Sequence, residues 1–163
     1  MAIPAWRVLP GAPGRLGGDA LSGPPARRHQ LARTLLPERF ERQSAAVPEV
    51  VPAIRRNLSA YAGALGARPG LVDAVALAAS EAMTSSIRHA YTRQLPGPLR
   101  VAAYAEGGQL VVIVEDEGAR APAREVDEDD GYGLAIISKL ADELAIDEWA
   151  DRPGTRVTMR FRL

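Results

Sequence analysis

The residues best suited to chemistry lie in the segment 80–91. Glu81, Ser85 and His89 follow one another at intervals of four residues, which places their side chains in one row along a helix. Leucine and alanine side chains border this row, so its face is partly apolar. A carboxylate at the edge of such a face is suited to act as a general base. Periodicity alone also permits a solvated helix face, in which Glu81 contacts Arg88 or water.

A second acidic group stands where an apolar segment ends. Residues 110–114 are apolar at every position, which is typical of a central strand buried on both faces. The segment leads into Asp116, which in the simplest interpretation only forms a turn. A buried carboxylate also accepts a hydrogen bond from an exocyclic amine such as that of adenine. Gly118 then lets the backbone approach a flat ring closely.

Two glycines, Gly131 and Gly133, stand at the start of the helix-like segment 131–140. Glycines at a helix start allow backbone N–H groups to point at an anion, and the helix dipole adds to that attraction. The pattern is neither a Walker A loop nor a Rossmann fingerprint, because the spacing of both is missing. A tight turn that caps the helix is the alternative interpretation.

Composition excludes several kinds of protein. The 163 residues suffice for one domain with a tail. The formal net charge is zero, so no overall field attracts nucleic acid or an anionic membrane. The chain has no cysteine, and His29 and His89 lack the spacing of a zinc site. Without a membrane-spanning run or a signal-like N-terminus, we expect a cytoplasmic protein with no membrane or nucleic-acid partner.

We expect a flexible tail over residues 1–33 and a folded domain over residues 34–163. The first 25 residues contain five prolines and five glycines, a composition that cannot offset its ordering entropy by burial. Trp6, Val8 and Leu9 form an apolar cluster in this tail. A peptide that docks on a partner or a neighbouring subunit is therefore the alternative to disorder.

Periodicity predicts the elements of the domain in order. A helix that begins at Ser44 or Pro48 and ends near residue 63 carries an apolar stripe. Pro37 confines the strand before it to a sheet edge, and Gly107 with Gly108 marks a hairpin turn. The expected strands cover residues 34–43, 99–106, 109–116, 144–150 and 155–163, further helices cover 71–91 and 131–140, and a loop or lid covers 117–130. This order predicts an α+β fold with a mixed, mostly antiparallel sheet and helices on one face.

The helix expected over residues 71–91 divides into two faces. The face that should pack on the sheet comprises Val72, Val75, Ala76, Ala79, Met83, Ile87 and Ala90. The opposite face comprises Ala74, Leu77, Ala78, Glu81, Ser85, Arg88 and His89. Both sets follow from a rotation of about 100° per residue.

Taken in order, these motifs resemble those of the GHKL ATPase superfamily, and in particular of the bacterial anti-sigma factor serine kinases. The segment that begins at Glu81 is similar to the family's Glu-Ala-x-Thr-Asn-x-x-x-His-Ala-Tyr, with Ser85 in place of the asparagine. Residues 116–120 resemble its Asp-x-Gly-x-Gly, 131–134 its Gly-x-Gly-Leu, 141–143 its Ala-Asp-Glu, and 154–157 its closing Gly-Thr-x-Val. The resemblance covers roughly residues 35–163.

The resemblance implies a two-layer GHKL-type (Bergerat) sandwich that binds ATP or ADP beneath a mobile lid. It implies that Glu81 activates a substrate hydroxyl, and that Asp116 reads the adenine amine with help from Gly118. Thr155 would support adenine through water. The implied phosphate motif comprises Gly131, Gly133 and Leu134. The implied partners are an alternative sigma factor, a STAS-domain anti-anti-sigma factor phosphorylated on Ser or Thr, and a second copy in a homodimer.

The chain departs from the family pattern at the metal position. Magnesium prefers octahedral oxygen ligands and keeps several waters. The side chain of Ser85 is one carbon shorter than the asparagine that it replaces. Ser85 is therefore the expected Mg²⁺ ligand only through a water or after a shift of the helix. Ser86 points about 100° further round the helix and is a poor substitute.

Other departures concern charge near the expected nucleotide. Arg120 stands where the family has a second glycine, and it either blocks the adenine side of the pocket or reaches a phosphate. Carboxylates just before the phosphate glycines would repel phosphate unless a lid turns them outward. They are Glu125, Asp127, Glu128, Asp129 and Asp130.

Three functions remain open at this point. One is an active serine/threonine-protein kinase that also sequesters a sigma factor. Another is a binding module of the same fold that has no kinase activity and acts by sequestration alone. The third is a sensor-kinase catalytic domain. We expect no pair of dimerisation helices carrying a substrate histidine in this chain, and this argues against the third function.

Overall fold

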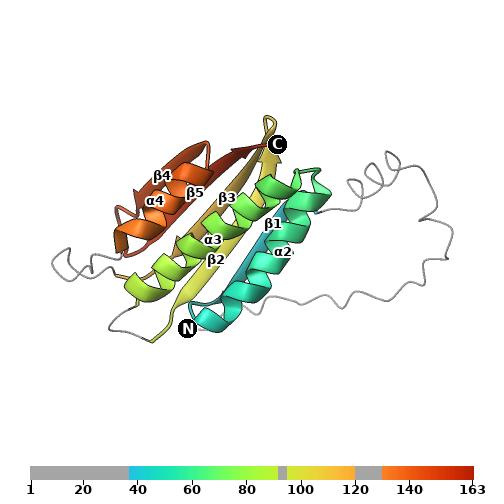
Figure 1. The fold of residues 1–163 in the computed structure, drawn as a ribbon. Coiled ribbons are helices and arrows are strands. Elements are labelled where there is room, and N and C mark those ends of the chain that lie inside the picture. The colour runs from blue at the N-terminus through green and yellow to red at the C-terminus, as the bar shows by residue number, and fades with distance from the viewer. Residues whose placement is uncertain (1–36, 92–94, 120–129) are drawn as a thin grey trace, which may run out of the picture.

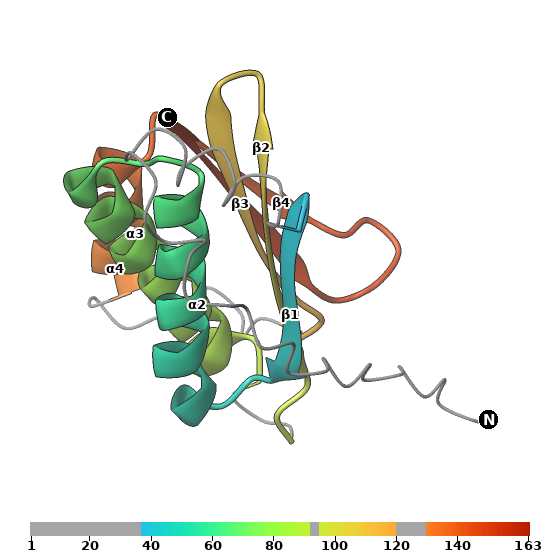
Figure 2. The same cartoon turned by 90° about the vertical axis from the view of Figure 1, so that its right-hand side faces the viewer.

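The computed structural model describes residues 37–91, 95–119 and 130–163 of the chain. Within them, a five-stranded antiparallel sheet forms one layer and three α-helices form the other, as the face-on and edge-on views show (Figure 1, Figure 2). All of these helices lie on the same face of the sheet. The predicted α+β sandwich is confirmed.

The strands are β1 (Arg39–Ala45), β2 (Pro98–Glu106), β3 (Gln109–Asp116), β4 (Glu143–Glu148) and β5 (Thr155–Arg162). The helices are α2 (Val51–Ala64), α3 (Pro69–His89) and α4 (Asp130–Leu140), and a 3₁₀ turn, η1 (Pro48–Val50), leads into α2. The strand order across the sheet is β1-β2-β3-β5-β4. Each neighbouring pair in this order is antiparallel.

Strands β2 and β3 form the hairpin that the glycine pair predicted. Gly107 and Gly108 adopt positive φ angles of 57° and 78°, which residues with a Cβ rarely adopt. Strand β3 is the central strand of the sheet. Two consecutive residues of β3, Val111 and Val112, point to opposite faces of the sheet and are both fully buried. This is expected for a strand that is apolar at every position.

The first strand lies at the sheet edge as predicted, but it is shifted along the chain. It begins at Arg39, beyond Pro37, whose missing N–H makes it a poor ladder residue. The strand continues to Ala45 and includes Ser44, which pairs with Leu99. Ser44 is therefore not a helix start, and the helical segment begins at Pro48. Residues 34–36 of the predicted strand lie outside the described residues.

Helix α3 begins two residues before its predicted start. Pro69 occupies the first helical position, where a missing N–H costs no hydrogen bond within the helix. The helix ends at His89, two residues before the predicted end. On the neighbouring helix α2, Ile54, Leu58 and Tyr61 are buried, so the predicted apolar stripe serves the core.

Helix α3 is the middle helix, with α2 on one side and α4 on the other (Figure 1). Val75, Ala79 and Met83 are fully buried, as the predicted sheet-facing side requires. Ala78 was assigned to the opposite side, yet it is fully buried as well. Because neighbouring helices cover the flanks of α3, its buried surface is broader than packing on the sheet alone would need. Leu77 remains 40% exposed.

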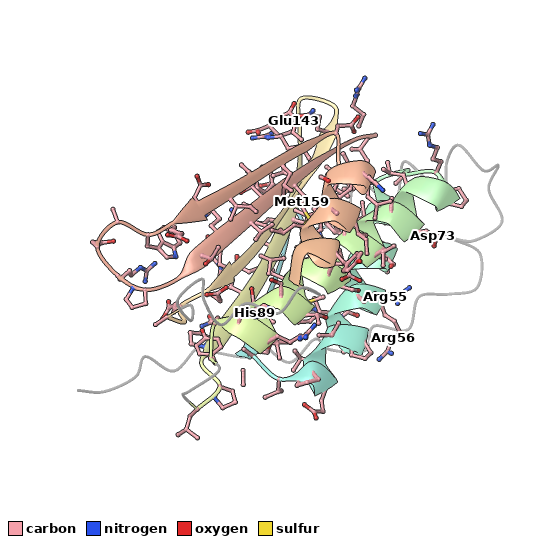
Figure 3. The ribbon with its side chains drawn as sticks, turned by 60° about the vertical axis from the view of Figure 1, so that its left-hand side comes forward. Arg55, Arg56, Asp73, His89, Glu143 and Met159 are labelled. Carbon is pink, nitrogen blue, oxygen red and sulfur yellow. The ribbon has the colours of Figure 1, made fainter. Side chains whose placement is uncertain are left out.

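The side chains between the two layers form one hydrophobic core. Met159 points from β5 into this layer, whereas Arg55, Arg56 and Asp73 lie on the outer surfaces of the helices (Figure 3). Each large aliphatic side chain buried in such a core contributes about 1.5–3 kcal/mol. This packing fixes α3 over β3 and β5 and α4 over β4, and the candidate site lies where these elements meet.

Candidate functional site

Asp116, the last residue of β3, is a buried carboxylate with 2% of its surface exposed. Its Oδ2 accepts a hydrogen bond from the Ser86 hydroxyl at 2.8 Å, and its Oδ1 accepts one from the Gly118 N–H at 3.2 Å. The hydrogen bond from Gly118 is the one expected if Asp116 only forms a turn. Burying a carboxylate is costly unless donors surround it. A carboxylate offers about four acceptor positions, so a ligand amine can be accepted alongside these protein donors.

Thr155 lies beside Asp116 at the start of β5. The two residues are register partners in the β3–β5 pair, so their side chains leave the sheet on the same face. Thr155 is 2% exposed. The structure thus brings together the two residues assigned to adenine, although α4 and β4 separate them in the sequence.

Gly118 packs against the end of α3. A Cβ at this position would collide with the backbone carbonyl and the side chain of Ala90. The missing side chain is therefore required by a contact between two segments of the protein itself. The sequence analysis predicted a different reason, the approach of a flat ring, and the contact with Ala90 is the one that the structure shows.

Tyr91 fastens the segment that follows β3. Its hydroxyl donates to the Pro98 carbonyl at 2.8 Å and accepts a hydrogen bond from the Glu117 N–H at 2.9 Å. Gly97 lies against its ring, where a Cβ would overlap the ring atoms. Burial raises the pKa of Tyr91, the hydrogen bond from Glu117 opposes this, and the charges of Asp116 and Glu117 raise it further. The phenol therefore acts as a neutral clamp.

Glu81 on α3 faces the first turn of α4. A Cβ on Gly133 would lie 3.5 Å from Oε2 of Glu81, an ordinary van der Waals distance. Gly131 and Gly133 both lie within α4, which begins at Asp130, so the glycine pair opens a helix as predicted. Glu81 is partly exposed, as a base that meets a substrate must be. The predicted base and a predicted phosphate glycine are therefore neighbours.

The adjacent serines of α3 point to different parts of the site. Ser85 is partly exposed and lies one helical turn beyond Glu81. Ser86 is only 6% exposed and is hydrogen-bonded to Asp116. The sequence analysis considered Ser86 only as a weak substitute for Ser85 and missed this bond. The available signal was its spacing of seven residues from Ala79, which places a hydroxyl on the core-facing stripe.

Leu134, the last residue of the predicted phosphate motif, is partly buried and packs against the hydrophobic core. Its side chain therefore holds α4 in place over the sheet. His89, at the other end of the predicted row, lies at the C-terminal end of α3 (Figure 3).

A pocket of about 280 Å³ adjoins this end of the sheet. Its volume is near the lower end of the ~300–1,000 Å³ range of small-molecule sites. Its lining comprises Gly118, Ala119, Glu148, Trp149, Arg152, Pro153, Gly154 and Thr155. The guanidinium groups of Arg152 and Arg156 lie 4.6 and 4.5 Å from the ring centroid of Trp149.

Trp149 is a residue that the sequence analysis missed. Its buried Nε1 atom has no hydrogen-bond partner among the residues that the structure describes. Buried donors without a partner are rare in folded proteins.

Several predicted residues lie outside the described part of the chain. These are Arg120, the acidic residues from Glu125 to Asp129, and the tail over residues 1–33. Asp130 is described only as the backbone start of α4. The lid and the tail therefore stay predictions.

Within residues 37–91, 95–119 and 130–163, no group of three or more histidine and acidic side chains is placed to hold a metal ion. In the same part of the chain, no helix has the length and hydropathy needed to cross a bilayer. Glu81 is an oxygen-bearing side chain that α3 places beside the first turn of α4, and Ser85 follows it one helical turn later.

The site combines a buried carboxylate at the exit of the central strand, a buried hydroxyl beside it and a glutamate that faces a glycine-opened helix. The sequence matches the family of histidine kinase-like ATPase domains over residues 44–161. The chain belongs to this family.

Individual relatives narrow the class. The serine-protein kinase RsbW of Bacillus licheniformis is 30% identical over 122 residues, which cover 66% of this chain and 76% of that protein. RsbW of Bacillus subtilis strain 168 has the same identity and coverage. The chain is thus homologous to RsbW serine-protein kinases, which confirms the resemblance drawn from its motifs.

A solved structure supports the fold. The crystal structure of the RsbU and RsbW domains of Rv1364c from Mycobacterium tuberculosis matches with a TM-score of 0.63 at 24% identity. The match covers 78% of this chain and 33% of that chain, so this chain spans about a third of its length. The GHKL-type arrangement of sheet and helices is confirmed by this likeness.

Proposed function

We propose that this protein binds ATP and ADP and acts as an anti-sigma regulatory factor of the serine-kinase type. The observation that carries the proposal is the side-by-side burial of Asp116 and Thr155 at the end of the central sheet strands. A carboxylate held there is an acceptor for the exocyclic amine of adenine, and the hydroxyl supports the same ring through water. The homology to RsbW serine-protein kinases supports the assignment.

The residues around this pair have separate tasks in the proposed reaction. Bound ATP supplies the phosphoryl group that is transferred. Glu81 accepts the proton of the attacking serine or threonine hydroxyl. Gly131 and Gly133 direct N–H groups of the first turn of α4 at the phosphates. Ser85, in the place of the family asparagine, would help to hold Mg²⁺, which would neutralise phosphate charge when it is bound.

The proposed partners follow from the same family. They are an alternative sigma factor that the protein sequesters, a STAS-domain anti-anti-sigma factor that it phosphorylates, and a second copy in a homodimer. We place the protein in the bacterial cytoplasm, where it regulates transcription in a stress response.

A second candidate function is a module that sequesters its partner without phosphorylating it. The observation that favours it is the short side chain of Ser85 on the row of Glu81. Phosphoryl transfer depends on charge neutralisation by magnesium, so a weaker metal position lowers turnover more than it lowers nucleotide binding.

Calorimetric titration with ATP and ADP, each with and without magnesium, tests nucleotide binding. We expect micromolar binding by the wild type. Asp116→Asn should lower the nucleotide affinity at least tenfold, because the asparagine amide replaces one acceptor oxygen of the carboxylate by an NH₂ donor. Ser80→Ala is the control, since the Ser80 hydroxyl only donates to the Ala76 carbonyl of its own helix at 2.7 Å. No binding by the wild type contradicts the proposal.

A transfer assay separates the two candidates. The wild type and Glu81→Gln are incubated with labelled ATP and a STAS-domain protein captured as a partner. Label that appears on the STAS protein with the wild type, but not with Glu81→Gln, supports the kinase function. Tight ATP binding and sigma-factor capture without transfer support the sequestering module.

A further inference from the structure

We propose that Ser86 is a positioning residue that sets the selectivity of the site for the purine base. This inference rests on the proposed adenine site. The Ser86 hydroxyl, brought in from α3, donates to Oδ2 of Asp116 at 2.8 Å. Both groups are buried, with exposed fractions of 6% and 2%, so the bond is shielded from solvent.

The two carboxylate oxygens of Asp116 are held from different directions. Oδ1 is bound by the Gly118 N–H of the following loop, and Oδ2 is bound by Ser86 of the helix above. The terminal torsion of an aspartate is otherwise broad. Donors on both oxygens therefore fix the plane of the carboxylate. Without Ser86, Oδ2 loses this donor and the carboxylate plane is held less firmly.

A fixed carboxylate plane discriminates between purines by the group at position 6. Adenine presents an amine there, which donates to a carboxylate. Hypoxanthine presents a carbonyl, whose lone pairs face those of the carboxylate with no proton between them. Sites built around one hydrogen-bonding pattern reject the analogue that lacks it, because a buried polar group is left unpaired. The more rigid the carboxylate, the less it can turn away from the wrong base.

The two neighbouring serines thus divide the site. Ser85 stands one helical turn beyond Glu81 on α3, whereas Ser86 stands against the base-reading carboxylate. A purely structural serine and a positioning serine make different predictions for base selectivity.

The test is calorimetric titration of ADP and inosine diphosphate without magnesium, which leaves the role of Ser85 out of the comparison. The variants are Ser86→Ala and Ser86→Cys, with Ser80→Ala as the matched control on the same helix. We expect Ser86→Ala to lose about five- to tenfold in ADP affinity, the range of one typical intramolecular hydrogen bond. Its affinity for inosine diphosphate stays within about twofold, so the ratio between the two ligands falls.

The outcomes separate the inference from the proposed function. If the wild type prefers ADP and Ser86→Ala keeps the same ratio, the role of Ser86 is overturned while the adenine site stands. If the wild type binds neither diphosphate, the adenine site itself fails and the role of Ser86 fails with it. Circular dichroism checks folding. Should Ser86→Ala be unfolded, Ser86→Cys decides, because it keeps a similar volume and is a weaker donor, and an unchanged ratio overturns the inference.

Discussion

The hydroxyl of Tyr91 accepts a hydrogen bond from the N–H of Glu117 at 2.9 Å and donates one to the Pro98 carbonyl at 2.8 Å. Tyr91 follows the helix that carries Glu81, and Glu117 follows directly on Asp116. One phenol therefore joins the helix bearing the proposed base to the strand bearing the proposed adenine acceptor.

Replacing Tyr91 by phenylalanine should destabilise the protein. The change leaves the Glu117 N–H and the Pro98 carbonyl without their partner, which costs about 1–3 kcal/mol in unfolding free energy. Urea unfolding followed by circular dichroism measures the loss. Tyr132→Phe is the control, because Tyr132 is 68% exposed and its change should stay within about 0.5 kcal/mol. Equal effects of the two variants would show that the clamp carries no energy.

The same residue predicts a loss of stability at alkaline pH. Burial raises the pKa of Tyr91 above its ordinary value of 10.0, so the folded state holds this proton more tightly than the unfolded state. The resulting stability is fully present below pH 10 and disappears as the pH rises through the raised pKa.

We therefore expect the unfolding free energy of the wild type to fall more steeply than that of Tyr91→Phe above pH 10. Burial also raises the pKa of Tyr61, but that residue is present in both proteins, so the difference reports on Tyr91. Urea unfolding between about pH 8 and 11 measures both slopes. Parallel slopes would exclude a titrating clamp at Tyr91.

Gly118→Ala should destabilise the fold by about 1–3 kcal/mol, the usual cost of forcing extra volume into a packed site. The new Cβ would meet the backbone of Ala90, which has little freedom to move. Gly63→Ala is the opposite control, because nothing lies within 4 Å of a Cβ at that position in α2. Alanine there should stabilise by about 0.5–1 kcal/mol. Thermal unfolding measures the stability change of both variants. A Gly118→Ala variant as stable as the wild type would contradict the packing argument.

The order of motifs predicted much of the site because each motif is local. The apolar run before Asp116 identified the central strand, and the glycine pair identified the start of α4. These two features depend on residues close together in the sequence, which periodicity and turn chemistry can read. Asp116 and Thr155 lie far apart in the sequence, and only the family pattern assigned both of them to adenine.

The contacts that hold the site could not be read in the same way. Ser86 reaches Asp116 and Tyr91 reaches Glu117 only after α3 has packed across the sheet. Ala78 is buried because α3 has a helix on each side, which a two-face pattern does not contain. Tertiary packing therefore decided the positions that the sequence analysis assigned wrongly or left out.

Glu115 should stabilise the open face of the sheet opposite the helices. Its carboxylate is 14% exposed and contacts Arg156 at 2.7 Å and Arg100 at 3.1 Å. Glu115→Gln should lower the unfolding free energy by about 1 kcal/mol at low salt and by less at high salt. Glu143→Gln is the control, because Glu143 is 65% exposed and lies 3.8 Å from Arg160. A salt-independent loss at Glu115 would point to packing instead of ion pairing.

Ser85→Asn should raise the magnesium-dependent affinity for ATP. The asparagine carbonyl extends one carbon further than the serine hydroxyl and returns the oxygen ligand of the family pattern beside Glu81. One added inner ligand should increase affinity about tenfold when magnesium is present, and leave it unchanged when magnesium is chelated. Calorimetry with ATP under both conditions measures the difference.

Thr84→Asn separates a metal effect from a general effect of asparagine on α3. Thr84 is exposed and lies next to Ser85 on the same helix, but about 100° away round its axis. It should leave ATP affinity unchanged with or without magnesium. If Ser85→Asn behaves like Thr84→Asn, the metal position is not what limits nucleotide binding. Arg120, which stands in the place of the second family glycine, would then be the next residue to replace, because the sequence predicts that it either blocks the adenine side of the pocket or reaches a phosphate.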